Sequence, residues 1–301
     1  MSKYDLSEEE IENGINRCMK DIYQETTPST SPKYIVICAG PGAGKTGVEN
    51  LRKSQLEKKG EKPAVLGADK VSQYHPHYED ALKELPEECY RITRQFIRPA
   101  MPKIFTKVKE ANRSILNERA LNKGKRDYDL INELREARYR IIVDIIATDE
   151  FVSRLSCYER AASELESGIS PRGVSEKTHQ EMYNGFVKEV YELIQNGMCD
   201  EVNVFTRGEK INEPKLIYKL GDNNYRDFND AIISERARQR KIIMSNPDAY
   251  LNRIARAIEK IKKYANNNSE ICQDLIKGLE QLREKFLKEQ QLTNGEVRNV
   301  N

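Results

Sequence analysis

A glycine-rich segment that ends in a lysine and a threonine is the part of this chain best suited to chemistry. Residues 39–46 read Ala-Gly-Pro-Gly-Ala-Gly-Lys-Thr, between the apolar run at 34–38 and a helical pattern. The glycines allow successive backbone N–H groups to surround phosphate oxygens, and the helix adds its positive N-terminal dipole. The spacing predicts a phosphate loop that binds a nucleoside triphosphate.

The residues expected to hold the nucleotide are Gly40, Pro41, Gly42, Ala43, Gly44, Lys45 and Thr46. Lys45 would reach the outer phosphates, and the Thr46 hydroxyl would ligate the Mg²⁺ that accompanies the nucleotide. Ala39 stands where the strict pattern has glycine, so a strand-to-helix turn that merely contains glycines is the alternative. A phosphate loop alone does not say whether the phosphate goes to water, to a substrate or nowhere.

Two carboxylates follow apolar runs that read as strands. Asp69 comes after the run at 64–66, and Glu118 comes after the run at 114–116. In an open α/β sheet both would emerge at the ligand-binding edge, beside the phosphate loop. Asp69 could accept the proton of an attacking hydroxyl or help to hold Mg²⁺, and the two together suggest an acceptor pocket. The alternative is that each is only a helix cap or first-turn acid.

Arginines and histidines elsewhere offer further candidates. Arg160 and Arg172 could be lid arginines that close over the triphosphate, although a single arginine is more often a solvated surface charge. The sequence His75-Pro76-His77 has no third metal ligand nearby, which favours a rigid loop near the acceptor site over a metal site.

The hydrophobic pattern predicts an α/β fold. Ser7 and Glu10 form a capping box before a helix over residues 8–24. Short apolar runs at 34–38, 64–66, 114–116, 141–147 and 202–205 alternate with helical patterns. This alternation predicts a mainly parallel sheet of the P-loop kinase type with helices on both faces.

Three helical stretches follow residue 223 and predict a C-terminal helical extension. They run from 228 to 244, from the Asn246-Pro247-Asp248 start signal onward, and from about 270 to 290. We therefore expect a kinase domain over residues 1–222 and an extension over 223–301. An apolar stripe in the last helix favours packing on the core or a neighbouring helix over a partner-binding face.

The charge balance and the cysteines of the chain bear on its partners. The 301 residues include 50 basic and 48 acidic side chains, for a net charge of +2, which gives no sign of a nucleic-acid or membrane partner. Six cysteines lie far apart without metal-ligand spacing. With no secretory segment or membrane span in the sequence, a reduced cytoplasmic protein is expected.

Taken in order, these motifs resemble the Zeta toxin family of bacterial kinases. The resemblance is carried by the phosphate loop, by an Asp six residues before His-Pro, by a Glu that ends the next strand, and by a lid with two arginines about a dozen residues apart. It extends from the N-terminal helix to about Leu220.

The resemblance implies transfer of the γ-phosphate of ATP to the sugar 3′-hydroxyl of UDP-N-acetylglucosamine, or to a related nucleotide or nucleotide sugar. It implies that Lys45 and Thr46 hold the triphosphate and Mg²⁺, and that Asp69 is the general base. Arg160 and Arg172 would clamp the phosphates, and Glu118 would bind the sugar nucleotide. The resemblance implies an antitoxin as partner. Because the C-terminal helices extend past the catalytic motifs, inhibition in cis by these helices is an alternative to a separate chain.

The chain departs from the family pattern on the acceptor side. Ala120 and Asn122 stand where the family has a threonine and an arginine that contact the sugar nucleotide. Loss of that arginine removes charge-assisted hydrogen bonds of about 1.5–3 kcal/mol. The substrate contacts expected here are Asp69, His75, Glu118 and Asn122. Alternatives are a kinase of nucleic-acid 5′ ends or of an antibiotic hydroxyl, and a non-catalytic nucleotide-gated binding protein.

Overall fold

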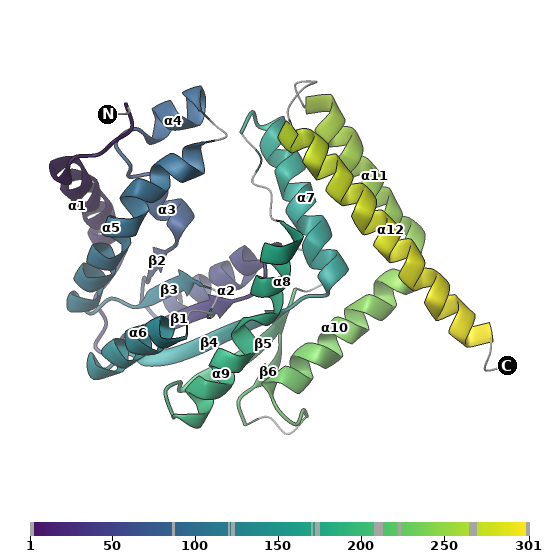
Figure 1. Ribbon diagram of the computed structural model, residues 1–301. Helices are drawn as coiled ribbons and strands as arrows, with labels where there is room; N and C mark the ends of the chain where they lie inside the picture. Colours follow the sequence, from purple (N-terminus) through teal and green to yellow (C-terminus); the bar gives the residue numbers. More distant parts are fainter. Residues whose placement is uncertain are drawn as a thin grey trace. The chain divides into compact units, whose positions relative to one another are not determined.

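The structure is a computed structural model that describes residues 3–85, 88–119, 121, 124–169, 171, 175–207, 213–221, 224–264 and 270–298. Its strands are β1 (Lys33–Cys38), β2 (Ala64–Leu66), β3 (Ile115–Glu118), β4 (Arg140–Ala147), β5 (Glu201–Thr206) and β6 (Lys215–Lys219). They form one sheet of order β2-β3-β1-β4-β5-β6 (Figure 1).

The sheet is mainly parallel, as the alternating pattern predicts. β1 pairs in parallel with β3 and β4, and β2 pairs in parallel with β3. β6 runs antiparallel to β5, and this strand was not predicted from the sequence. Because β1 lies between β3 and β4, its carboxyl end is at the point where strand order reverses, which is where open α/β sheets bind ligands.

The helices over 8–24, 228–244, from Pro247 onward and from about 270 are all present near their predicted bounds. The helices of the structure are α1 (Glu8–Glu25), α2 (Lys45–Glu57), α3 (Ala68–Ser72), α4 (Tyr78–Glu84), α5 (Cys89–Glu110), α6 (Lys125–Glu136), α7 (Glu150–Glu166), α8 (Glu176–Asn184), α9 (Phe186–Gln195), α10 (Phe228–Ser245), α11 (Pro247–Tyr264) and α12 (Glu270–Arg298). The capping box before α1 is present, with both reciprocal bonds between Ser7 and Glu10. α12 continues beyond the predicted end near residue 290.

The contacts divide the chain into two compact units. The first comprises Met1–Ala39, Gly44–Ile146 and Asn184–Phe228, and the second comprises Gly40–Ala43, Ala147–Tyr183 and Asn229–Asn301. The functional division at residue 222 that the sequence favours remains a prediction.

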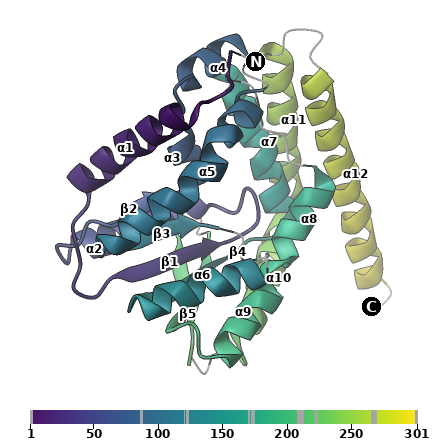
Figure 2. The same cartoon turned by 60° about the vertical axis from the view of Figure 1, so that its left-hand side comes forward.

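Helices cover both faces of the sheet in the first unit. Ile35 of β1 packs with Leu56 of α2, while Tyr34 points to the opposite face and meets the ring of Phe105 in α5 at 5.9 Å. α5 in turn packs against α1, α3 and α4, which lie around it in Figure 2. This layering fixes the strand ends that lead into α2 and α3.

In the second unit, α11 and α12 pack beside α7 (Figure 1). The rings of Phe151, Tyr250 and Phe286 meet at its centre, with Phe151 5.3 Å from Phe286. The apolar stripe of α12 is buried in the same cluster, at residues Leu275, Leu279, Leu282 and Phe286. The prediction that this stripe packs on neighbouring helices is therefore confirmed.

Candidate active site

The turn between β1 and α2 has the backbone conformation of a loop that wraps an anion. Gly42 and Gly44 have φ angles of +72° and +94°, a region in which a residue with a Cβ is strained. Gly44 is also the N-cap of α2, and no side chain caps this helix. Its first N–H groups and its positive end thus favour an anion such as a phosphate.

Lys45 and Thr46 begin α2, directly after this turn. Lys45 is partly buried, whereas Thr46 is exposed. The positions match what the phosphate loop requires, since a lysine at the helix start reaches outer phosphates and an exposed hydroxyl can ligate a metal.

Asp69 and Glu118 lie at the carboxyl ends of neighbouring strands, as the sequence predicts. Asp69 is exposed in the first turn of α3, and Glu118 is the partly buried last residue of β3. Burial raises the pKa of the Glu118 carboxyl, and the charge of Lys45 opposes this shift. The nearby carboxylates of Glu49 and Asp69 raise the pKa further, and Lys70 lowers it. Glu118 is therefore within electrostatic reach of both Lys45 and Asp69.

Glu49 and Lys70 are neighbours of this group that the sequence analysis missed. Glu49 is only 8% exposed, and its Oε1 accepts a hydrogen bond from Lys70 Nζ at 2.9 Å. The side chain of Lys70 is 51% exposed. Their spacing in the sequence could have indicated these two residues, because Glu49 follows Lys45 by one helical turn and Lys70 follows Asp69 directly.

Arg119 is committed to a structural ion pair. Its Nε donates to Asp127 Oδ1 at 2.7 Å, and Asp127 is 2% exposed. Arg119 therefore does not replace the missing acceptor arginine. Ala120 and Asn122, at the positions of the family's threonine and arginine, lie outside the described residues.

His75 is buried within its loop. The ring is 2% exposed, lies 6.1 Å from the ring of Phe96 and accepts a hydrogen bond from the His77 N–H at 3.0 Å through Nδ1. Burial lowers the pKa of His75 to about 4. This favours a role in holding the loop, and direct substrate contact by His75 stays a prediction. Among the described residues, no group of three or more potential ligands could hold a metal ion.

In the second unit, residues 40–43 of the phosphate loop are held by α7 and the segment before it. Ser153 Oγ donates to the Pro41 carbonyl at 2.6 Å, and Thr148 Oγ1 donates to the Ala43 carbonyl at 3.1 Å. The single Ser153 proton is thus used, so His179 Nε2, 2.9 Å away, must donate to Ser153. Burial lowers the pKa of His179 to about 4, which keeps this ring neutral.

Of the two predicted lid arginines, Arg160 lies among the described residues. Arg160 lies on α7, with a 45% exposed side chain 3.8 Å from Glu164. Arg172 lies outside the described residues. Clamping of phosphates by this pair remains a prediction.

No helix among the described residues is both long enough and apolar enough to cross a membrane.

Comparisons with known proteins agree with the motifs. The family model described as Zeta toxin matches residues 17–213, whereas no curated protein sequence matches the chain. A chain of the PezAT chromosomal toxin–antitoxin system of Streptococcus pneumoniae is similar in structure, with a TM-score of 0.66 and 16% identity over 95% of this chain and 100% of that chain. The AvrRxo1-ORF1:-ORF2 structure with ATP has a TM-score of 0.54 and 9% identity over 92% of this chain and 88% of that one. At these identities the two structures show likeness of fold.

Proposed function

The chain belongs to the Zeta toxin family, and from this premise we propose that it transfers the γ-phosphate of ATP to a hydroxyl of UDP-N-acetylglucosamine or a related nucleotide sugar or nucleotide. The observation that carries the proposal is that Lys45, Asp69 and Glu118 follow or end three parallel strands at the carboxyl edge of the sheet. Lys45 and Asp69 both act on the pKa of Glu118 there. In this proposal Lys45 neutralises charge on the phosphates, and Asp69 and Glu118 serve the acceptor.

Asp69 is suited to the role of general base. Its carboxylate is exposed at the start of α3, where it can accept the proton of the acceptor hydroxyl as the oxygen attacks phosphorus. Lys45 stabilises the negative charge on the transferred group, and the backbone N–H groups of the glycine turn hold the remaining phosphates in line.

The residues present also fit a magnesium ion that arrives with the nucleotide. The exposed Thr46 hydroxyl is a hard oxygen ligand of the kind that Mg²⁺ prefers. The ion would neutralise charge on the β- and γ-phosphates.

The acceptor is proposed to carry phosphate. Glu118 supplies a partly desolvated carboxyl that can bond a sugar hydroxyl, and the half-exposed Lys70 supplies a cation held by Glu49. Lys70 follows Asp69 directly, and its side chain is 51% exposed although Nζ donates to Glu49, so we propose Lys70 as a cation for an acceptor diphosphate.

Two further parts of the proposal draw on the structural neighbours. Likeness to a chain of a toxin–antitoxin system supports an antitoxin partner, and likeness to a complex with ATP supports ATP as the donor. We propose a toxin activity that is restrained by an antitoxin on a separate chain.

Product analysis tests this function. The purified protein is incubated with ATP, Mg²⁺ and UDP-N-acetylglucosamine, or with a metabolite extract, and phosphorylated species are identified by mass spectrometry. We expect loss of product by about 100-fold or more in Lys45→Ala and in Asp69→Asn. Lys53→Ala is the matched control, because this lysine lies on the same helix with a 49% exposed side chain.

The outcomes separate the acceptors. Phosphorylated UDP-N-acetylglucosamine made only by the wild type and the control would support the family substrate despite Ala120 and Asn122. A different phosphorylated nucleotide would assign another acceptor. ATP binding without any product in wild type would favour a nucleotide-gated binding protein and would refute the proposed transfer.

A further inference from the structure

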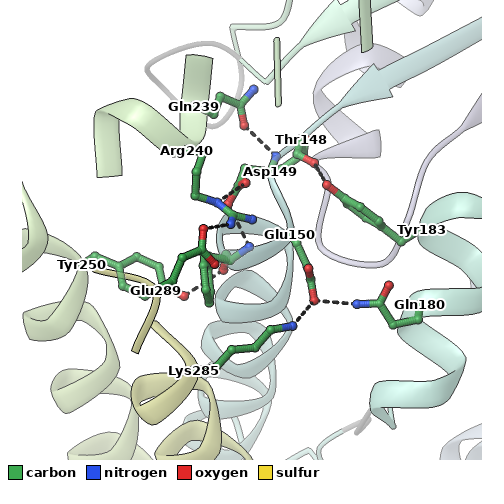
Figure 3. A network of polar contacts seen from close by, with 11 residues as sticks. Thr148, Asp149, Glu150, Gln180, Tyr183, Gln239, Arg240, Tyr250, Lys285 and Glu289 are labelled. Carbon is green, nitrogen blue, oxygen red and sulfur yellow. Dashed lines mark hydrogen bonds and ion pairs between the residues drawn. The ribbon is translucent and has the colours of Figure 1, made fainter. Parts of the chain in front are cut away.

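The side-chain amide of Gln239 in α10 binds the backbone on both sides of Thr148, within the second unit. Its Oε1 accepts from the Asp149 N–H at 2.9 Å, and its Nε2 donates to the Ala147 carbonyl at 3.0 Å. Figure 3 shows Gln239 aimed at this segment. Nε2 also donates to Glu235 at 2.7 Å, so every amide group is used and its orientation is fixed.

Thr148 links this segment to the phosphate loop. It is 1% exposed, its hydroxyl donates to the Ala43 carbonyl at 3.1 Å, and its own carbonyl accepts from Tyr183 Oη at 2.9 Å (Figure 3). Ala43 precedes Gly44 and Lys45 directly in the chain. Gln239 thus holds, from both sides, the residue that binds the phosphate-loop carbonyl.

Charged contacts reinforce the attachment of the C-terminal helices. Arg240 Nε donates to Asp149 Oδ2 at 2.7 Å, and the same guanidinium is bonded to Glu289 of α12. Lys285 of α12 donates to Glu150 at 2.8 Å (Figure 3). The start of α7 is therefore tied to α10 and α12 by ion pairs as well as by the buried ring cluster.

From this geometry we infer that Gln239 is a positioning residue for the nucleotide site, and that α10 acts through Thr148 to hold the phosphate loop in its binding conformation. The inference rests on the proposed binding of ATP at residues 40–46. It gives the C-terminal helices a supporting role in nucleotide binding, which is opposite to inhibition in cis.

A double-mutant cycle on the full-length protein tests the inference. Gln239→Leu removes both backbone contacts, Thr148→Val removes the hydroxyl that bonds Ala43, and affinity for Mg·ATP is measured by titration calorimetry. We expect each single variant to raise the Kd for ATP on the order of tenfold, and the double variant to raise it little further, because both changes break one chain of contacts. Turnover at saturating ATP should change far less than the KM for ATP.

Gln239→Asn provides a second variant in case leucine prevents folding. It keeps an amide but is one methylene shorter, so it cannot span both backbone groups and should show the same rise in Kd. Lys241→Ala is the matched control, since this exposed residue lies two positions further along α10.

Three results would overturn the inference. Gln239 variants could bind ATP as the wild type does, or the effects of Gln239→Leu and Thr148→Val on the Kd could be fully additive. Gln239 variants could also bind ATP more tightly and be more active, as they would if the C-terminal helices inhibited the site. Failure of the wild type to bind ATP would remove the proposed function and the inference together. Normal wild-type binding and transfer with an unaffected Gln239→Leu would remove the inference alone.

Discussion

Replacement of Gly42 by alanine is the sharpest test of how the phosphate loop is built. A Cβ at this position would lie 2.2 Å from the carbonyl oxygen of Ser153, a backbone group of α7, and φ is +72°. Two separate penalties act here, because the residue is both conformationally strained and blocked by backbone. Gly60 offers a matched control, since φ is +78° there and no atom lies within 4 Å of the added Cβ.

The expected magnitudes follow from these two geometries. Positive φ costs a residue with a Cβ about 1–2 kcal/mol, so Gly60→Ala should lower the free energy of unfolding by about that amount. Gly42→Ala should lose a further amount of about 1–3 kcal/mol from overpacking. To avoid Ser153 the loop must move by about 1 Å, and displacement on this scale can reduce turnover by about 100-fold.

The assay compares wild type, Gly42→Ala and Gly60→Ala by urea unfolding, by calorimetric titration with ATP and by turnover. We expect Gly60→Ala to lose stability without loss of ATP binding, and Gly42→Ala to lose both. If the two variants lose the same free energy and bind ATP equally well, the steric reasoning about Gly42 and Ser153 is refuted.

Stability should fall on acidification below the usual histidine pKa, because burial lowers the pKa of His75 and of His179 to about 4. Between about pH 6.5 and pH 4 the unfolded chain then binds more protons than the folded chain, so the free energy of unfolding decreases as pH falls through this window. Unfolding midpoints that stay constant from pH 7 to pH 5 would contradict this prediction. Arg52 binds the fully buried Asp144 through two hydrogen bonds of 2.6 Å. Arg52→Met should therefore lower the free energy of unfolding in urea by about 3–5 kcal/mol, because it leaves a buried charge without its partner. A loss below about 1 kcal/mol would show that water screens this pair as it screens surface pairs. Burial raises the pKa of Glu118, so the stability this carboxyl contributes is lost as pH rises past its ordinary pKa. Glu118→Gln should therefore raise the unfolding midpoint at pH 7 while it raises the KM for the acceptor; a lowered midpoint would count against that desolvation.

Local signals in the sequence predicted most of the fold. The Ser7–Glu10 capping box gave the start of α1, and Asn246-Pro247 gave the start of α11, because helix ends are determined by a few adjacent residues. β6 was missed because it is an edge strand in which only Tyr218 is buried and the other residues are exposed or partly buried. Such a strand lacks the apolar alternation of a half-buried strand and is held by pairing with β5.

The acceptor side was only partly predictable. The placement of Asp69 and Glu118 follows from the rule that ligands bind at the carboxyl ends of parallel strands. The sequence did not indicate that Glu49 is buried against Lys70 or that Arg119 is bound to Asp127. A long polar side chain has many rotamers, and its partner is chosen by packing of the whole unit.

The sequence by itself determined that a phosphate loop follows the first strand. Gly42 and Gly44 act through their own backbone, and Lys45 begins the helix that directly follows. Only the tertiary structure decided what holds that loop. Thr148 and Gln239 lie 105 and 92 residues from their respective backbone partners, Ala43 and Ala147. A hydrogen bond over such a separation has no local sequence pattern, because it forms only where folding brings a donor and an acceptor to the same buried place.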